Sequence, residues 1–284
     1  MMARIGYCCP FVPIELITAC GHTPCRPQPM PARRDEIEGL CAWANAFSAA
    51  VRQADAAVFT TGCDQMRRMY EKHTLQSDKP AFLLNIPKTG SPTAHTILCD
   101  EFERLERFLV ELDGGRTDPA LLTDPMNHSA SQTVESQDKG LAVIGGPLFE
   151  CDFFDLSQLT AARGLPIVFN GTESAWQNLR TPFEPTAGNS PPLAALADYY
   201  LRTPAIWRRP AEPFFDRLTE AIHRRRVLGA MVIRHPFCDY WKAAIFDLRK
   251  RLTVPLICIE TDSCARLSAA SLSRLEAFLE QWEQ

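Results

Sequence analysis

The chain has 284 residues, 46% of them apolar and 23% charged, which is enough material for about two domains at the usual ~150 residues each. Its net charge of −4 argues against nucleic acid as the main partner, and no apolar run approaches the ~20 residues that span a bilayer. The start of the chain lacks the pattern of a secretory leader. We therefore expect a cytoplasmic protein whose eleven cysteines are thiols or metal ligands rather than disulfides.

The first segment predicts a strand, a turn and a helix. Residues 4–8 are typical of a short strand, Cys9 follows in the turn, and Pro13 suits the first turn of a helix that ends at Gly21. The chain therefore begins with a cysteine at the point where a strand gives way to a helix.

A proline-rich loop over residues 22–34 separates this unit from a second helix. Asp35 is expected to cap that helix, whose apolar residues fall on one face over residues 36–53. Cys41 lies within it. Its place on an amphipathic helix fits a plain core cysteine.

The strand–cysteine–helix arrangement is clearest at residues 56–70, AAVFTTGCDQMRRMY. An apolar strand ends at Gly62, Cys63 and Asp64 form the turn, and a helix follows. A cysteine in this position leaves the edge of a sheet and faces the positive end of a helix. Both features favour the thiolate, which is the form that binds metal.

The middle of the chain continues the alternation of strands and helices. A strand is expected over residues 81–86 and a long helix over 94–112, and the polar residues 114–137 are expected to form a linker or a short helix between two halves. We therefore predict two domains, over residues 1–135 and 136–284.

The second half opens with a strand over residues 141–144 that runs into Gly145 and Gly146. Two glycines after a strand are a candidate cradle for a phosphate or for coenzyme A, although the pattern alone is weak. Cys151 follows closely and is a lesser candidate ligand. A helix near residues 155–163, a strand over 166–170 and an irregular tract over 181–192 come next.

The strand–cysteine–helix arrangement returns at residues 230–248, AMVIRHPFCDYWKAAIFDL, with Cys238 and Asp239 at the turn. Asp64 and Asp239 are both predicted to be helix N-caps, worth about 1 kcal/mol each. A strand over residues 254–260 and a helix over 269–282 end the chain.

Two further patterns near this unit allow opposite interpretations. His235 is a candidate to donate a proton or to hydrogen-bond a metal ligand, and a strand-end histidine that faces solvent is the alternative. The paired arginines Arg208–Arg209 and the run at 224–226 lie beside helical patterns and are expected to form solvated helix faces.

Strands that alternate with helices predict an α/β protein with two doubly wound parallel sheets of the Rossmann or flavodoxin type. In such sheets ligands bind beyond the carboxyl ends of the strands, where the turn cysteines lie, so we expect the site in the cleft between the two domains. Four other cysteines fall within apolar patterns and are expected to be core residues: Cys20, Cys25, Cys99 and Cys258.

Thiols drawn from distant parts of the chain favour an iron–sulfur cluster over zinc, because structural zinc sites usually use closely spaced pairs such as CxxC, which this sequence lacks. A cluster with three protein ligands would keep one iron open for an external ligand. Composition alone leaves both metals possible.

Several motifs together resemble the 2-hydroxyacyl-CoA dehydratase and benzoyl-CoA reductase family. In the opening motif GYCCPFVPIELITACG, Cys9 is followed by Pro13, by Glu15 and by an Ala-x-Gly. The other matching segments are LCAWANAF, TTGCDQMRRMYE, HPFCDYW, VPLICIETD and SRLEAFLE, so the resemblance spans nearly the whole chain. The sequence begins almost at the first motif, so we expect the upstream segment of larger members to be missing.

The resemblance implies a [4Fe-4S] cluster or a double-cubane [8Fe-9S] cluster, and a separate ATP-hydrolysing iron–sulfur activator protein that delivers single electrons. It implies Cys9, Cys63 and Cys238 as ligands, with Cys41 as a further candidate and Cys8 as a competitor of its neighbour. It also implies that Glu15 takes part in acid–base chemistry or caps its turn.

Three hypotheses follow for the function. The first is a low-potential reductase or dehydratase, a homodimer or a heterodimer with a related subunit, that acts on a small molecule such as an acyl-CoA thioester. The second is a double-cubane reductase of small substrates without coenzyme A. The third is a non-catalytic cluster carrier or partner subunit.

Overall fold

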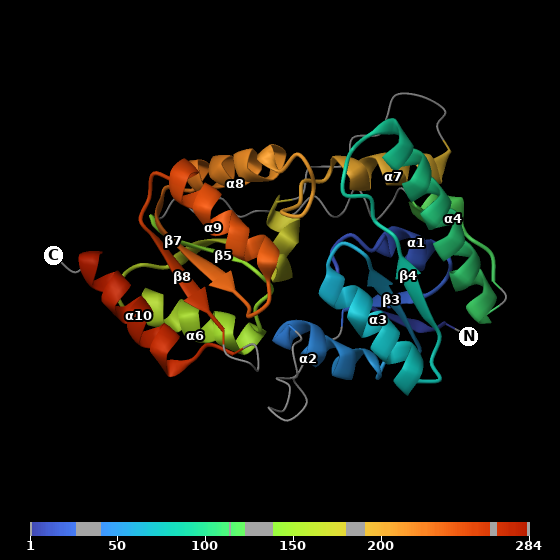
Figure 1. Cartoon of the computed structure of the whole chain (residues 1–284), viewed down its shortest axis with the longest axis horizontal. Helices are drawn as coiled ribbons and strands as arrows, with labels where there is room; N and C mark the ends of the chain where they lie inside the picture. Colours follow the sequence, from blue (N-terminus) through green and yellow to red (C-terminus); the bar gives the residue numbers. More distant parts are fainter. Residues whose placement is uncertain are drawn as a thin grey trace. The chain divides into compact units, whose positions relative to one another are not determined.

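The computed structural model describes residues 2–26, 41–113, 115–122, 139–179, 191–261 and 266–282 (Figure 1). They form two compact units, each built on a four-stranded parallel sheet flanked by helices. The predicted class, a two-domain α/β protein with parallel sheets, is confirmed. Within these ranges, no helix combines the length and the apolar character that crossing a membrane requires.

The two units share the chain in an interleaved way, whereas the prediction placed one boundary at residues 135 and 136. The first unit comprises Met1–Met30, Phe47–Ser131 and Arg180–Pro210, and the second comprises Pro31–Ala46, Gln132–Leu179 and Ala211–Gln284. The late segment joins the first unit because helix α7 (Pro192–Arg202) packs on helix α4 (Pro92–Asp113). The rings of Phe102 and Tyr200 meet edge to face there, with centroids 5.8 Å apart.

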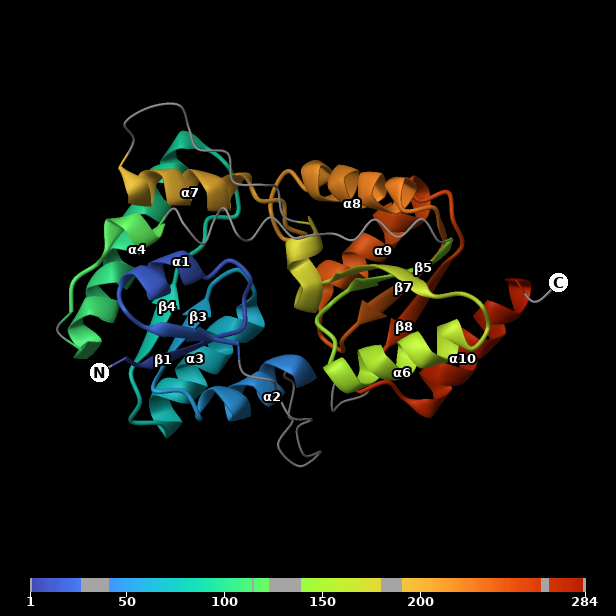
Figure 2. The same ribbon diagram turned by 180° about the vertical axis from the view of Figure 1, so that it is seen from behind.

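The first sheet has the strand order β2-β1-β3-β4, and every pair in it is parallel. Its strands are β1 (Arg4–Tyr7), β2 (Thr23–Cys25), β3 (Ala56–Thr60) and β4 (Ala81–Leu84). Helices α1 (Ile14–Ala19) and α4 lie on one face, and α2 (Ala42–Val51) and α3 (Asp64–Gln76) lie on the other (Figure 2). This is the arrangement that right-handed crossovers impose.

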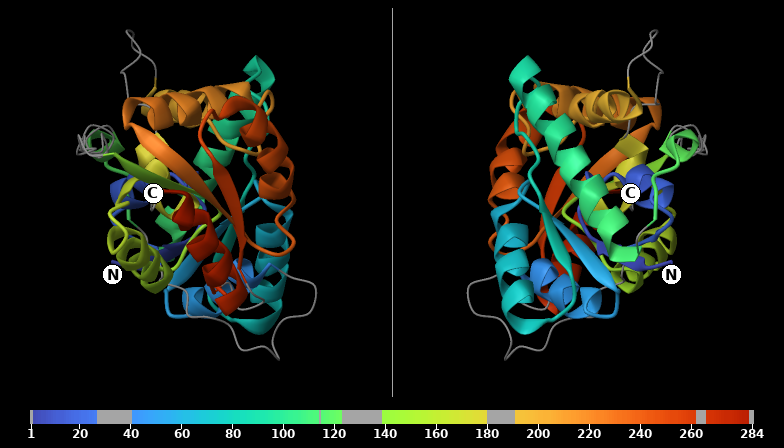
Figure 3. Two further views of the ribbon diagram at one scale, coloured as in Figure 1. Left: turned by 90° about the vertical axis from the view of Figure 1, so that its left-hand side faces the viewer. Right: turned by 90° about the vertical axis from the view of Figure 1, so that its right-hand side faces the viewer.

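The second sheet repeats this plan with the order β6-β5-β7-β8, again all parallel. Its strands are β5 (Gly140–Gly145), β6 (Ile167–Thr172), β7 (Val227–Arg234) and β8 (Leu256–Glu260). Helices α6 (Glu150–Ala161) and α10 (Ala269–Leu279) cover one face, and α8 (Glu212–Arg224) and α9 (Asp239–Arg251) cover the other (Figure 3). Short 3₁₀ helices are η2 (Pro119–Leu122), η3 (Glu173–Leu179) and η4 (Glu280–Trp282).

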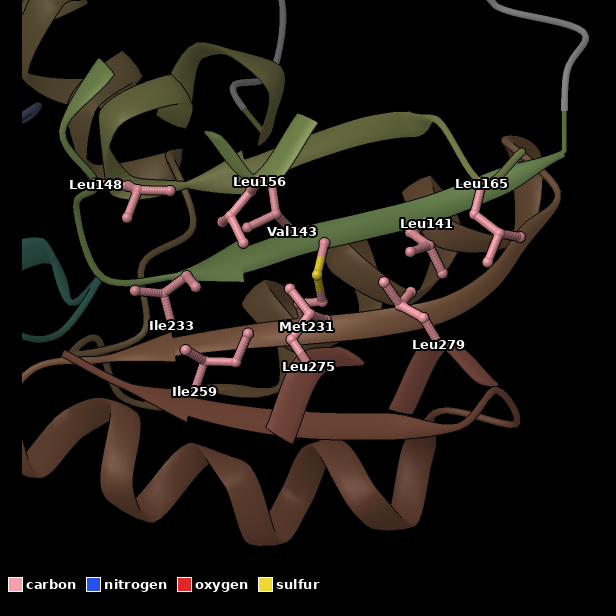
Figure 4. Close-up of a cluster of buried hydrophobic side chains, with 10 residues drawn as sticks. All are labelled: Leu141, Val143, Leu148, Leu156, Leu165, Met231, Ile233, Ile259, Leu275 and Leu279. Carbon is pink, nitrogen blue, oxygen red and sulfur yellow. The ribbon is translucent and has the colours of Figure 1, made fainter. Parts of the chain in front are cut away.

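Period-two alternation builds the core of the second unit. Leu141 and Val143 on β5 point to the same face as Met231 on β7, where Leu156 of α6 and Leu275 of α10 meet them (Figure 4). All five are fully buried, and each such side chain contributes roughly 1.5–3 kcal/mol by leaving water. This packing fixes the sheet face that α6 and α10 cover.

Some expected elements fall outside the described residues. These are the helix start at Asp35, most of the expected linker at 114–137 and most of the tract at 181–192. The described part of that linker contains η2, in agreement with a short helix.

Each sheet has a topological switch point, where the chain leaves neighbouring strands in opposite directions. In the first sheet it lies between β1 and β3, and in the second it lies between β5 and β7, because both sheets follow the same 2-1-3-4 pattern. Ligands of doubly wound folds bind beyond the carboxyl ends of the strands at this point.

Candidate metal centre

The turn cysteines of the two units occupy equivalent positions. Cys63 is the N-cap of α3 and Cys238 is the N-cap of α9, and each follows the strand on the β3 or β7 side of its switch point. Their carbonyl oxygens begin the helices, accepting from the backbone N–H of Arg67 at 3.3 Å and of Lys242 at 3.0 Å. Both side chains are half-buried.

The predicted N-caps Asp64 and Asp239 are wrong by one residue. Both aspartates are the first helical residue, and the preceding cysteine has the non-helical backbone of a cap, with φ −127° and ψ 133° at Cys63. A carboxylate in the first turn still interacts favourably with the positive end of the helix dipole. The aspartates therefore stabilise the helices from the first helical position, while the cysteines occupy the N-cap positions.

Cys9 lies at the other strand of the first switch point. It follows β1, and its carbonyl oxygen accepts from the N–H of Val12 at 3.2 Å. Pro13, expected in the first turn of the helix, is instead the N-cap of α1, one residue before that turn. Because β1 and β3 are neighbours, with Tyr7 opposite Val58, Cys9 and Cys63 leave adjacent strands at the same edge of one sheet. Both are half-buried.

The remaining candidate cysteines differ in exposure. Cys41 directly precedes α2 and its carbonyl oxygen accepts from the N–H of Asn45 at 3.0 Å, so it too stands at a described helix start. Cys8 is half-buried beside Cys9, and Cys151 is exposed in the first turn of α6. Among the described residues, no three or more His, Cys, Asp or Glu side chains gather closely enough to hold a metal.

Arg208 is the residue of this region that the sequence did not reveal. It was expected on a solvated helix face, yet its exposed fraction is only 6%, in the loop between α7 and α8. Its guanidinium lies over the rings of Phe11, at 5.3 Å, and Trp207, at 5.2 Å. The two rings meet edge to face, so the charge is enclosed by aromatic surface.

The guanidinium of Arg208 is only partly hydrogen-bonded. Its Nη2 donates to the carbonyl oxygen of Tyr200 at 2.7 Å, whereas Nε and Nη1 are buried and have no acceptor among the described residues. Burial lowers the pKa of Arg208 to about 10, and the charge of Cys9 acts in the opposite direction. The side chain is therefore cationic at pH 7, and it lies over the ring of Phe11, two residues beyond Cys9.

Glu15, the predicted acid–base residue of the first unit, is fully buried in α1. The hydroxyl of Tyr200 donates to its Oε2 at 2.7 Å and also contacts the carbonyl oxygen of Val12 at 3.3 Å. Tyr200 therefore ties α7 to the helix that follows Cys9, and through its own carbonyl oxygen it also holds Arg208.

His235 is buried in the second unit, with an exposed fraction of 2%, so the solvent-facing alternative is wrong. Its Nε2 lies 2.6 Å from the carbonyl oxygen of Pro147, which can only accept, so Nε2 carries the hydrogen. Nδ1 then accepts from the hydroxyl of Thr261 at 2.7 Å. Burial lowers the pKa of His235 to about 4, although its bond to Pro147 opposes the shift, so the ring is neutral at pH 7.

The pair Gly145 and Gly146 has a packing reason. Gly145 has φ +121°, and a Cβ there would lie 2.2 Å from the backbone oxygen of Ile233. The N–H of Gly146 donates to that same oxygen at 2.9 Å, and a Cβ at Gly146 would meet the ring of His235 at 2.9 Å. A phosphate cradle at this turn would have to use other N–H groups, and that role stays a prediction.

Comparisons with known proteins bear on the whole chain. A family model described as 2-hydroxyglutaryl-CoA dehydratase, D-component, matches residues 9–133 and 122–282. No curated protein sequence matches the chain.

Two solved structures align over nearly the full length of both chains. The first is the periplasmic zinc binding protein TroA from Treponema pallidum, with 12% sequence identity, 99% of each chain covered and a TM-score of 0.28. The second is a mutant of the laminin-binding adhesin Lmb from Streptococcus agalactiae, with 11% sequence identity, 100% of this chain and 99% of the adhesin covered, and a TM-score of 0.24. At such scores neither carries an argument for this chain.

Proposed function

The chain belongs to the 2-hydroxyglutaryl-CoA dehydratase D-component family, and from this premise we propose that it is the iron–sulfur cluster-bearing component of a reductase or dehydratase dependent on an ATP-hydrolysing activator protein. The family implies dehydratase chemistry in general. The proposed substrate is a small molecule, with an acyl-CoA thioester as the leading class. The proposed assembly is a dimer with an identical or a related subunit.

The residue types at the ends of the strands support such a cluster. Cysteine thiolates are the ligands of iron–sulfur clusters, and Cys9 and Cys63 follow neighbouring parallel strands at one switch point, which is the observation that carries the proposal. Cys238 is the equivalent residue of the second unit. We propose these three as ligands and Cys41 as a fourth candidate.

A bound cluster would supply single electrons at low potential. The chain's own residues would hold and position it. The bond between Tyr200 and Glu15 fixes the helix after Cys9, and both groups are buried, so we propose a positioning role for Glu15 rather than proton exchange with solvent.

His235 has a comparable part in the second unit. Its backbone oxygen accepts from the N–H of Cys238 at 3.2 Å, and both ring nitrogens are hydrogen-bonded within the described residues. The neutral ring would therefore hold the Cys238 turn. Proton transfer by His235 would require that one of its bonds open first.

The test is the metal content of protein purified without oxygen. We expect a brown protein with about four irons and about four acid-labile sulfides per [4Fe-4S] cluster, and about eight irons for a double-cubane cluster. Cys63→Ala and Cys238→Ala should each lose iron and sulfide. The matched control is Cys258→Ala, because Cys258 lies within β8 and not at a strand-end turn. It was expected in the core, but it is half-buried, and burial raises the pKa of its thiol.

A colourless wild type, or two cysteine variants that retain their iron like the control, would rule out the proposal. Turnover of the purified chain with activator, ATP and substrate separates an enzyme from a cluster carrier, because a carrier would hold iron without turning over any acyl-CoA thioester.

A further inference from the structure

Buried cations are almost always paired or fully hydrogen-bonded, because removing a charge from water costs several kcal/mol. Arg208 departs from that rule within the described residues. It is 94% buried by its 6% exposed fraction, and Nε and Nη1 lack acceptors there. The guanidinium holds its N–H donors in a fixed plane, which suits an anionic partner.

The surroundings of Arg208 indicate where that partner lies. The charge of Cys9 raises the pKa of Arg208 against the effect of burial. Phe11, two residues beyond Cys9, and Trp207 stack on the guanidinium. Trp207 also lies 3.4 Å from the position of a Cβ on Gly62, the residue before Cys63. Phe11 and Trp207 thus link Arg208 to the Cys9 turn and to the Cys63 turn of the first switch point.

We propose that Arg208 is the anion-binding residue of the Cys9 turn, and that an N–H group of its guanidinium without an acceptor in the described residues donates to the anionic group that Cys9 and Cys63 hold. The identity of that group as a cluster rests on the proposed function. A one-electron reduction by an external donor adds one negative charge to the group. A fixed positive charge beside it stabilises the reduced form more than the oxidised form and so raises the reduction potential.

A hydrogen bond within the protein fixes the orientation of the Arg208 guanidinium. Nη2 donates to the carbonyl oxygen of Tyr200, near the end of α7, and the hydroxyl of Tyr200 donates to Glu15. The bond at Nη2 fixes the plane of the guanidinium, while Nε and Nη1 keep N–H groups without an acceptor in the described residues. This makes Arg208 a positioning and charge-compensating residue, and not a participant in proton transfer.

The first measurement uses the cluster-loaded full chain. Arg208→Gln should give a more negative midpoint potential in a titration with titanium(III) citrate followed by paramagnetic resonance, and it should lose iron faster to a chelator. Arg208→Lys keeps the charge and should lie closer to the wild type. Arg202→Gln is the control, because it removes the same charge from a half-exposed side chain that is paired with Asp198. An Arg208→Gln potential equal to that of the control would overturn the inference.

The second measurement does not depend on a cluster. In metal-free full-length protein with Cys8→Ser, Cys9 is alkylated by anionic iodoacetate and by neutral iodoacetamide at low salt, and the peptide is quantified by mass spectrometry. Both reagents attack the same thiolate, so the rate with iodoacetate divided by the rate with iodoacetamide reports the local charge. This ratio should fall several-fold in Arg208→Gln and stay at the wild-type value in Arg208→Lys.

If Arg208→Gln fails to fold by circular dichroism, the wild-type protein still decides. Its iodoacetate preference at Cys9 should exceed that of N-acetylcysteine, and an equal or lower preference refutes the inference. A wild type without iron would refute the proposed function and leave this thiol measurement to decide on Arg208 alone.

Discussion

The anchor of the Cys238 turn can be tested by one substitution, Thr261→Val. The hydroxyl of Thr261 donates to Nδ1 of His235, and the exposed fractions of the two residues are 3% and 2%. Valine has the same shape but no hydroxyl, so Nδ1 becomes a buried acceptor without a donor. Such a loss costs about 1–3 kcal/mol of unfolding free energy. The Nε2 bond to Pro147 cannot compensate, because that nitrogen already carries its hydrogen.

The matched control is Thr160→Val. Thr160 is also fully buried, but its hydroxyl donates at 3.3 Å to the carbonyl oxygen of Ser157, which lies inside α6 and has its own helical partner. That change should cost at most about 1 kcal/mol. The assay is urea unfolding of the metal-free chain at pH 7, followed by circular dichroism. Equal losses in the two variants would refute the assigned tautomer and with it the anchoring role of His235.

Two further changes probe the scaffold. Burial lowers the pKa of His73, whose exposed fraction is 3%, although a hydrogen bond with the backbone at Lys79 opposes the shift. The unfolded chain, with its histidine pKa near 6.5, therefore takes up the proton first as the pH falls. Unfolding free energy should therefore decrease below about pH 6.5. His73→Leu removes the titrating group, so its stability relative to the wild type should increase on acidification, and parallel pH curves would contradict this account. Gly145→Ala should lower the thermal midpoint far more than Gly21→Ala. Both glycines have positive φ, but only a Cβ at Gly145 would meet the backbone of Ile233. Similar midpoints would show that the backbone of β7 can move to accept the Cβ.

The strand-to-helix turns could be predicted from the sequence because their causes are local. An apolar strand, a Gly-Cys-Asp or Phe-Cys-Asp turn and a polar helix fix the position of Cys63 and Cys238 within a few residues. The error of one residue in the N-caps has a physical origin as well. Aspartate is the usual cap, and the sequence gives no warning that the cysteine takes the extended backbone in its place.

The burial of Arg208 could not be predicted because it depends on residues far away in the sequence. Adjacent arginines after a helical pattern are typical of a solvated surface, and only the fold brings Phe11 against Trp207 and Arg208. The same holds for Tyr200, which bonds Glu15 across 185 positions, and for the return of residues 180–210 to the first unit. Local periodicity in the sequence does not predict such contacts between distant residues.

The choice of cysteine at two helix N-caps is itself informative. Aspartate, asparagine or serine at an N-cap stabilises a helix by about 1 kcal/mol relative to a residue that cannot accept from its first N–H groups, and in both units an aspartate stands one position too late to do so. Stability alone would favour the reverse order at each turn. The same departure from a local rule, at equivalent switch-point positions of two separate sheets, indicates that the position itself is needed for the thiol. Because the first unit adds Cys9 and a buried, incompletely bonded cation at its switch point, the pattern favours an anionic ligand held by thiolates over a purely structural use of these cysteines.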